Sequence, residues 1–425
     1  MRVLATLVAI AMISMACGST TPSVPPHAAP AASSPPGSVV TAPPSPDSSC
    51  GSGPAASAPG PYPIVSIPAA SIRSVQLPST FYQAHRLAQS GPLVVFDEVG
   101  YGDVTGKLGR SIFLVDLATG TESIIATAAD GDAAWMPDIS GQRVIWLELR
   151  YQGRFTFTGA ITWRLMGLDL ATKTVHEIDH GVNRRLEGPS AVSPTIQVDG
   201  DTVAYSVEDP GPGRPFGWKL ILRSWTTGRI VRTIPTSRSI YSLALDNGNV
   251  AYSEGLVDTP LSFKYSTRLM LSTTTHPTPQ EVAPDAFEVA MDGGRLTWTN
   301  DRTASQDRIG TAEHPRTYTA STKDLTPVPI SAPPDLKIER GASYPAVSGD
   351  EVAWIDNQDT PSHPDPKVTH VVVWNATSAT AVQVEPTGGA ALVGLGAGWL
   401  SWYDDSESDI YVRGVPLSSL ASSCP

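Results

Sequence analysis

The sequence predicts an all-β fold of seven four-stranded antiparallel blades, a seven-bladed β-propeller, with six or eight blades as the alternatives. Two segments share one motif: MPDISGQRVIWLE at 136–148 and YPAVSGDEVAWID at 344–356. Weaker copies of the motif occur between and around them. Each copy carries an aromatic residue in a β-rich run, at successive spacings of 50, 59, 47, 46, 56 and 48 residues. These aromatics are Phe96, Trp146, Tyr205, Tyr252, Trp298, Trp354 and Trp402. A period near 50 with about four strands per unit is typical of a propeller blade, and the sequence lacks long runs of helical period.

The second copy shows how four strands fit into one unit. We expect them, from the innermost outward, at 138–140, 143–148, 163–170 and 174–178. In the second of these strands Val144 and Trp146 follow the period of two that a packed strand needs. Gly141 stands between the first two strands, where a tight hairpin requires a positive φ. No blade can bury its apolar faces alone, so the copies are expected to stack around an axis.

The order of strand, glycine turn, aromatic strand and loop, with V-A-[WY] in the second strand, resembles the TolB-like propeller repeats of bacterial envelope proteins. The likeness covers roughly residues 80–420. Turns in that family commonly read Ser-Pro-Asp-Gly, whereas this chain has SGQR, DGDT, DNGN, DGGR and SGDE. The family also commonly has six blades. The resemblance therefore implies the propeller fold more than any inherited role.

The N-terminus predicts export. Arg2 precedes a short apolar run at 3–13, which is too short to span a bilayer as a permanent helix. We interpret residues 1–16 as a signal peptide. Cys17 then looks like the lipobox cysteine of a bacterial lipoprotein, acylated after cleavage and holding the protein on the outer side of the cytoplasmic membrane or at the cell surface. The alternative is ordinary cleavage after Ala16, which would release the chain.

A Pro-, Ala- and Ser-rich stretch at 17–62 is expected to form a disordered tether, and residues 63–425 the propeller. Part of 63–79 is predicted to supply the outer strand of the last blade, because the unit at 390–420 has only a weak fourth strand. A propeller brings its chain ends together, so a Cys50–Cys424 disulfide is predicted, with two unpaired thiols as the alternative.

Composition and motifs exclude some classes of function but do not identify one. The net charge of −12 argues against a nucleic-acid partner. No motif predicts a cofactor or a metal site, and no G-x-S-x-G, C-x-x-C, H-E-x-x-H or P-loop pattern occurs. No catalytic residue is assigned, yet an enzyme stays open because propeller enzymes collect catalytic residues from separate blades.

Acidic residues recur two positions after the aromatic of the second strand, or three in the third unit. If the blades align, these side chains form a ring on the face where the second strands end. They are Glu98, Glu148, Glu208, Glu254, Asp356 and Asp404. Such a ring would hold a metal ion or attract a cationic ligand. The simpler interpretation is that polar residues end strands and accept backbone N–H bonds.

The longest loops connect the second and third strands, so they lie on the same face. Aromatic residues occur in or beside them, and Tyr151, Phe155 and Trp218 are the candidates for ligand contact. The alternative is that these rings pack the loops onto the propeller. We therefore expect a monomeric binding or scaffolding module for an envelope protein, peptide or glycan. A glycan-active lyase or hydrolase and a passive structural envelope protein are the other hypotheses.

Overall fold

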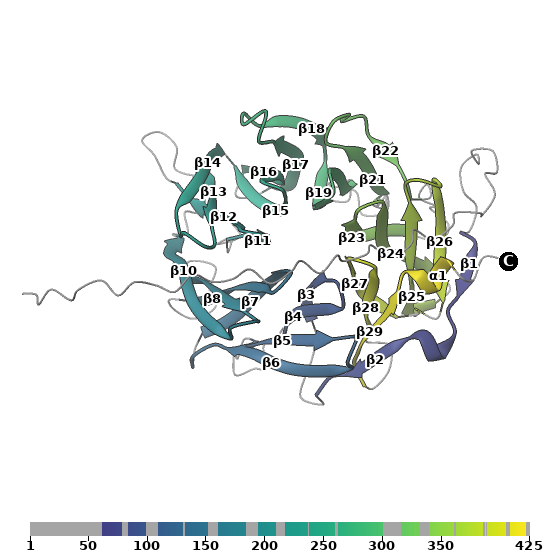
Figure 1. The fold of residues 1–425 in the computed structure, drawn as a ribbon. Coiled ribbons are helices and arrows are strands. Elements are labelled where there is room, and N and C mark those ends of the chain that lie inside the picture. The colour runs from purple at the N-terminus through teal and green to yellow at the C-terminus, as the bar shows by residue number, and fades with distance from the viewer. Residues whose placement is uncertain are drawn as a thin grey trace, which may run out of the picture. The chain divides into compact units, whose positions relative to one another are not determined.

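Seven separate β-sheets follow one another along the chain (Figure 1). The computed structural model describes residues 62–78, 84–98, 109–130, 132–151, 160–183, 194–209, 217–236, 238–259, 262–300, 316–331, 340–360, 363–385, 387, 389–404 and 409–421. All of them belong to one compact unit, Pro46–Pro425. The predicted signal peptide, almost all of the predicted tether, and Cys17, Cys50 and Cys424 lie outside these residues.

The first four blades each contain four antiparallel strands in chain order from the innermost strand outward. Blade 1 contains β3 (Ala84–Ser90), β4 (Leu93–Glu98), β5 (Ser111–Asp116) and β6 (Thr121–Thr127). Blade 2 contains β7 (Asp132–Ser140), β8 (Arg143–Tyr151), β9 (Ile161–Asp169) and β10 (Thr174–Asn183). Blade 3 contains β11 (Ile196–Asp199), β12 (Thr202–Glu208), β13 (Trp218–Ser224) and β14 (Ile230–Thr236). Blade 4 contains β15 (Ser239–Asp246), β16 (Asn249–Thr259), β17 (Ser262–Ser272) and β18 (Gln280–Pro284).

The last two blades also include strands from the N-terminal side of blade 1. Blade 5 contains β19 (Ala286–Asp292), β20 (Arg295–Asn300), β21 (Arg316–Ser321) and β22 (Val328–Pro329). Blade 6 contains β23 (Arg340–Ser348), β24 (Glu351–Thr360), β25 (His363–Asn375), β26 (Thr380–Glu385) and β1 (Ile64–Ser66). Blade 7 contains β27 (Ala390–Gly396), β28 (Trp399–Asp404), β29 (Tyr411–Pro416) and β2 (Arg73–Gln76). The short helices are η1 (Ala69–Ser71) and α1 (Ser418–Ala421).

The innermost strands close a ring. Contacts run in order from β3 through β7, β11, β15, β19, β23 and β27, and from β27 back to β3. The predicted seven-bladed propeller is therefore confirmed, and the four strands expected for the second copy correspond to β7, β8, β9 and β10.

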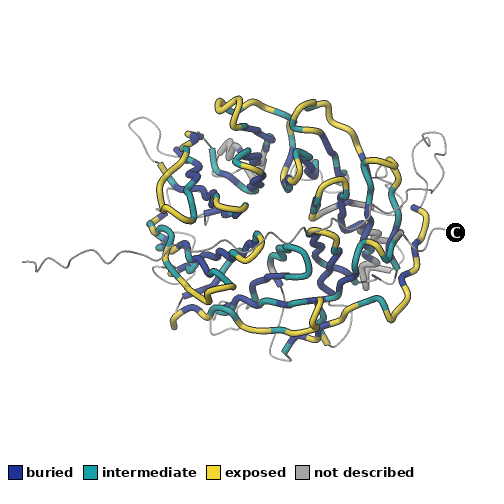
Figure 2. Tube along the Cα trace, in the orientation of Figure 1, coloured by how far each residue is buried: buried dark blue, intermediate teal, exposed yellow. Residues whose placement is uncertain are grey.

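The core lies between the blades. Seven hydrophobic clusters occur among the described residues, each shared by two neighbouring blades. The recurring aromatics of the second strands are all at most 1% exposed. Trp146, for example, packs with residues of blades 1 and 2 in one such cluster. Figure 2 shows buried positions along the inner strands and exposed positions along the outer strands and turns. Burial of one large aromatic at each interface explains why the sequence repeats it.

The segment at 62–77 acts as a strap across blades 6 and 7. β2 pairs antiparallel with β29, which confirms the prediction that this stretch completes the last blade. β1 pairs parallel with β26 as a fifth strand of blade 6, which the sequence did not predict. The strap buries Tyr62, Val65, Ile67, Val75 and Leu77, each at most 7% exposed.

At five interfaces, one turn contact repeats between neighbouring blades. The last residue of an inner strand accepts a hydrogen bond, through its side-chain oxygen, from a backbone N–H in the first turn of the next blade. We call this contact the turn latch. The acceptors are Ser90, Ser140, Asp199, Asp246 and Asp292, at donor–acceptor distances of 2.9, 3.0, 2.6, 2.8 and 2.7 Å.

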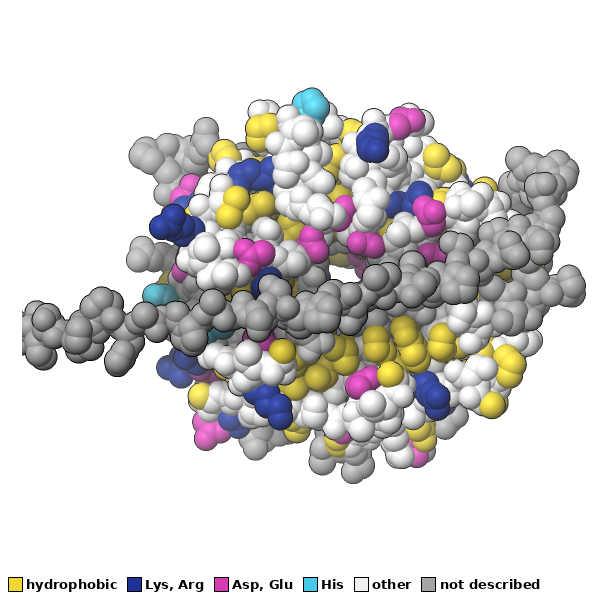
Figure 3. Space-filling view, in the orientation of Figure 1, with side chains coloured by type: hydrophobic (Ala, Val, Ile, Leu, Met, Phe, Trp, Pro, Cys, Tyr) yellow, Lys and Arg dark blue, Asp and Glu magenta, His cyan; other side chains and the backbone are white. Residues whose placement is uncertain are grey.

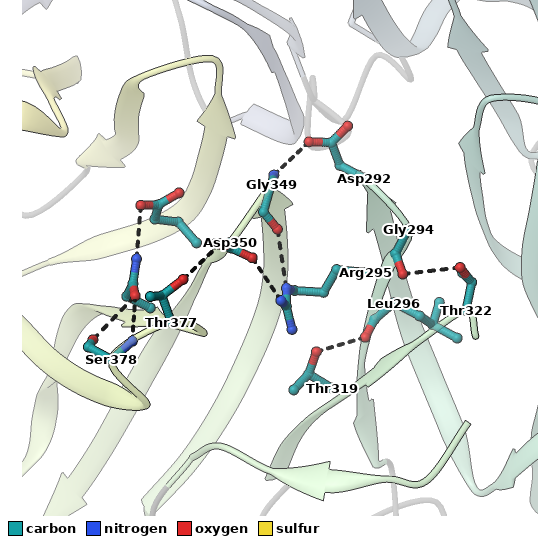
Figure 4. Close-up of polar contacts among 12 residues, drawn as sticks. Asp292, Gly294, Arg295, Leu296, Thr319, Thr322, Gly349, Asp350, Thr377 and Ser378 are labelled. Atoms are coloured by element: carbon teal, nitrogen blue, oxygen red, sulfur yellow. Dashed lines mark hydrogen bonds and ion pairs between the residues drawn. The ribbon is translucent and has the colours of Figure 1, made fainter. Parts of the chain in front are cut away.

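Between blades 5 and 6 an arginine reinforces the turn latch (Figure 4). Asp292 accepts from the Gly349 N–H, and Arg295 donates to the Gly349 carbonyl at 3.2 Å and to Asp350 Oδ1 at 2.9 Å. The Arg295 guanidinium also lies 5.6 Å from the ring centre of Trp374. Arg143 makes the same set of contacts from blade 2 to blade 3, with Gly200, Asp201 and Trp225.

Figure 3 shows an opening at the middle of the ring, with acidic side chains beside it. Three consecutive inner strands end in Asp199, Asp246 and Asp292. Burial, with the charges of Asp246 and Asp199, raises the pKa of Asp292 above its usual value, although the Gly349 N–H opposes the shift. The carboxylates of these latches therefore influence one another across blades.

Candidate binding face at the ends of the second strands

The predicted acidic residues stand at matching positions of separate blades, where β4, β8, β12, β16, β24 and β28 approach their ends. We call this side of the propeller the B–C face, because the connections from each second strand to the third begin there. The expectation of a long loop is wrong for blades 4 and 6, because β16 and β17, and likewise β24 and β25, extend to within two residues of each other. In the other blades much of the connection lies outside the described residues. The strand ends hold their carboxylates in different ways.

Two of the carboxylates face arginines directly across the strand pair. Glu254 is 2% exposed, and Arg268 Nε donates to its Oε1 at 2.8 Å. Glu148 makes the equivalent ion pair with Arg164. Both pairs are register partners between second and third strands. These carboxylates therefore neutralise cations within their own blades, and removing one partner would leave a charge in a poorly solvated site.

Blades 6 and 7 use related pairs. Asp404 is 3% exposed, with its Oδ2 3.1 Å from Arg413 Nε. Asp356 is buried and is the register partner of His370, whose Nδ1 lies 3.0 Å from Glu385 Oε1. Asp404 is therefore paired within its own blade, and Asp356 is buried beside the strand that carries His370.

The other two predicted acids differ. Glu98 ends β4 half-buried, and this burial raises the pKa of its carboxyl above the usual value. Glu208 ends β12 opposite Trp218. Across the described residues, no group of three or more His, Cys, Asp or Glu side chains is arranged as a metal site would require.

The predicted aromatic contacts fall in different places. Trp218 begins β13 and is 5% exposed, so its ring packs inside the structure. Tyr151 is the last residue of β8. Phe155 lies outside the described residues.

The inner strands contain a feature that the sequence reasoning missed. Six of the seven have a β-bulge near the B–C face, where the register with the second strand shifts. In β7 and β23 the bulge holds a non-glycine residue at positive φ, Met136 at 52° and Tyr344 at 54°. A carboxylate of the preceding blade accepts the N–H of each: Asp97 Oδ2 that of Met136 at 2.8 Å, and Glu288 Oε2 that of Tyr344 at 2.6 Å.

At the bulges of blades 4, 5 and 6 stand the aromatic residues Tyr241, Phe287 and Tyr344, and the first two are in contact. The rings of Tyr241 in β15 and Phe287 in β19 lie 6.0 Å apart, centre to centre. Phe287 precedes Glu288, which holds Tyr344. We call Tyr241, Phe287, Glu288 and Tyr344 the axial aromatic patch. The signal in the sequence was the start of the repeated phrase, where Met136 and Tyr344 each precede a proline.

The comparisons with known proteins identify the fold. The β-propeller domain of the trilobed protease from Pyrococcus furiosus, which has an open velcro topology, matches with a TM-score of 0.53 and 10% identity over 80% of this chain and 96% of that one. The uncomplexed acylaminoacyl peptidase from Pyrococcus horikoshii matches with a TM-score of 0.52 and 14% identity over 80% of this chain and 53% of the peptidase. The chain thus corresponds to about half the length of that enzyme.

No protein-family model matches the sequence, and no curated protein matches it. The structural likenesses place the chain in the class of β-propeller repeat proteins. In the part of the chain that the structure describes, no helix is both long and apolar enough to cross a membrane.

Proposed function

We propose that this protein is an exported, lipid-anchored β-propeller that acts as a binding or scaffolding module at the cell envelope through its B–C face. The observation that carries the proposal is the axial aromatic patch, where Phe287 and Tyr344 remain exposed although Trp298 and Trp354 on the second strands of the same blades are buried. Exposed aromatic side chains on a rigid scaffold are typical of recognition surfaces.

The contacts of the carboxylates on the B–C face favour a structural role for these side chains over a catalytic one. Glu148, Glu254 and Asp404 are ion-paired with arginines on the adjacent strand. A general acid or nucleophile must reach its substrate, and a carboxylate held in such a pair is poorly placed for this. A binding module therefore agrees better with these contacts than a glycan-active enzyme does.

The lipid anchor is proposed from the sequence around Cys17. We expect the full-length protein to partition into detergent when expressed in a bacterial host, and Cys17→Ser to move it to the aqueous phase. Mass spectrometry of the mature N-terminus would identify a diacylglyceryl group. An unmodified N-terminus produced by cleavage after Ala16 would contradict the anchor while leaving export intact.

The binding role is tested by affinity capture after chemical cross-linking in intact cells. The bait is the full-length protein, and the variant shortens the B–C connection of blade 5 between residues 300 and 316. A matched control exchanges the turn between β5 and β6 on the opposite face. We expect partners that are lost with the B–C variant and kept with the control. Equal capture by both variants would contradict the proposal.

A further inference from the structure

We propose that the axial aromatic patch receives an arginine or lysine side chain carried on an extended peptide of the partner. This inference rests on the proposed function and names the ligand chemistry of the same face. It is carried by the contacts within the patch, its exposure, the strained backbone within it, and its charge.

The patch joins residues of three blades through one ring contact and one hydrogen bond. Tyr241 of β15 and Phe287 of β19 have ring centres 6.0 Å apart and an interplanar angle of 35°. Glu288 follows Phe287 in the chain and accepts a hydrogen bond from the Tyr344 N–H at 2.6 Å. A Cβ on Gly255 would lie 2.1 Å from Tyr241 Cε2, so the glycine makes room for the Tyr241 ring. The Phe287 ring thus contacts Tyr241, and the carboxylate of the next residue, Glu288, contacts the Tyr344 backbone.

The exposure of Phe287 and Tyr344 contrasts with the burial of the second-strand tryptophans of the same blades. Phe287 is 38% exposed and Tyr344 46% exposed, whereas Trp298 and Trp354 on the adjacent second strands are at most 1% exposed. Leaving apolar area in water is unfavourable, and an exposed group of aromatics on a stable scaffold is typical of a site that a ligand covers.

Tyr344 also has an unfavourable backbone conformation. Its φ of 54° is disfavoured for a residue with a Cβ, and it precedes Pro345, which restricts the residue before it further. Glu288 holds this conformation through the Tyr344 N–H, and Thr299 donates to the same carboxylate oxygen at 3.3 Å. Strain of this kind is retained where the surrounding structure fixes it, and it occurs preferentially at binding and catalytic sites.

The chemistry of the patch fits a cation. Exposed aromatic faces attract Arg and Lys through cation–π interactions, and Arg stacks best. The Glu288 carboxylate, which accepts the Tyr344 N–H, adds a negatively charged acceptor to the patch. The net charge of −12 favours approach of a basic partner over an acidic one. A neutral sugar would stack on the rings but would gain little from the carboxylate charge.

The test is a selection of random linear peptides on the immobilised full-length protein, followed by affinity measurement with the enriched synthetic peptide. We expect enrichment of Arg or Lys. Glu288→Gln retains an oxygen that can accept the Tyr344 N–H, and we expect it to weaken binding about tenfold, with Phe287→Ala and Tyr344→Ala weakening it similarly. Replacing the basic residue of the peptide by citrulline or norleucine should cost a similar factor.

The matched control is Ile230→Ala, which removes an exposed apolar side chain from β14 at the outer edge of blade 3 and should leave the affinity unchanged. Circular dichroism and thermal melting of each variant establish that loss of binding is not loss of folding. Enriched peptides without a basic residue, affinities indifferent to Glu288→Gln, or binding of cell-wall glycan fragments alone would each overturn the inference.

The two proposals fail separately. If peptide binding depends on the B–C connections but not on Phe287, Glu288 or Tyr344, the inference about the patch is wrong and the proposed function stands. If captured partners and selected peptides depend on neither, both are wrong.

Discussion

The interface between blades 5 and 6 and the interface between blades 7 and 1 occupy equivalent places in the ring but are held differently. Between blades 5 and 6, Asp292 and Arg295 join the turns through charged groups and backbone hydrogen bonds. Between blades 7 and 1, β27 ends in Gly396, which has no side chain to accept a latch bond, and a Cβ there would lie 2.7 Å from the Gly91 nitrogen. The inner strands instead approach closely, and Ser401 Oγ donates to Gln89 Oε1 at 2.6 Å.

This difference follows from where the chain begins and ends within the ring. Interfaces between consecutive blades join segments close in sequence, whereas blades 7 and 1 meet at residues separated by more than 300 positions, such as Gln89 and Ser401. Closing such a long loop costs conformational entropy, which close packing and an added strand offset. The strap supplies that strand, with Val75 and Leu77 buried in the cluster shared by blades 7 and 1.

The largest effect is expected from removing the strap. Deletion of residues 62–77 exposes the edges of β26 and β29 and removes five buried apolar side chains. At about 1.5–3 kcal/mol for each, the loss should exceed about 5 kcal/mol. Urea unfolding followed by tryptophan fluorescence measures it. A control variant that lacks only residues 1–61 should be as stable as the intact protein. Near-equal stability of this control and of the variant without residues 62–77 would contradict a role for the strap in closing the ring.

The next largest loss of stability is expected from Gly396→Ala. The new methyl group meets the backbone nitrogen of Gly91, which cannot move without shifting blade 1, so a loss of about 2 kcal/mol is expected. Gly398→Ala is the control, because its Cβ would point into open space and only the positive φ of 79° is unfavourable, at about 1 kcal/mol. Equal midpoints in urea for the two variants would show that the close approach between blades 7 and 1 does not matter.

The interface between blades 2 and 3, where Asp138 accepts from the Val198 N–H, should respond to pH. Burial is the main cause that raises the pKa of Asp138 from 3.8 to about 6, although Arg86 and the Val198 N–H oppose the shift. The folded protein therefore binds more protons than the unfolded chain between about pH 4 and pH 6, and this group lowers stability as pH rises through that window. Asp138→Asn should remove about 1–3 kcal/mol of this dependence while its amide oxygen still accepts from Val198. Identical pH profiles for variant and wild type would contradict this assignment.

The smallest effect is expected at Arg295. Arg295→Lys keeps the charge but loses the planar group that joins the Gly349 carbonyl, Asp350 and the Trp374 ring. Because Asp350 is largely exposed, the expected loss is about 0.5–1 kcal/mol. Arg143→Lys, at the matching site between blades 2 and 3, should give a similar value in thermal unfolding. A loss above about 2 kcal/mol at either site would mean that these contacts hold the ring more strongly than their exposure indicates.

Much of the fold was predictable because each blade repeats the same local chemistry. Buried aromatics such as Trp146 and Trp354 mark the second strands, whose side chains fill the interfaces. The spacing of the seven recurring aromatics predicted the number of blades. The closing strand β2 was predictable from the alternating apolar residues Val75 and Leu77 and from the weak end of the last copy. β1 was missed because three residues in parallel pairing leave little pattern in a sequence.

The binding face was only partly predictable. The positions of Glu148 and Glu254 follow from the strand period, but their function as ion-pair partners depends on arginines across the sheet. The bulge at Tyr344 was not predictable, because it is held by Glu288, 56 residues away on another blade. Contacts between blades of this kind are set by the ring as a whole and not by any one repeat.

The most direct test of the central claim places a photo-reactive amino acid at Tyr344, on the B–C face, and separately at Ile230, on the outer edge of blade 3. Irradiation of intact cells should join the protein to a partner from the position of Tyr344 and not from that of Ile230. Equal cross-linking from both positions, or cross-linking from Ile230 alone, would contradict the account that this propeller binds through the inner end of its B–C face.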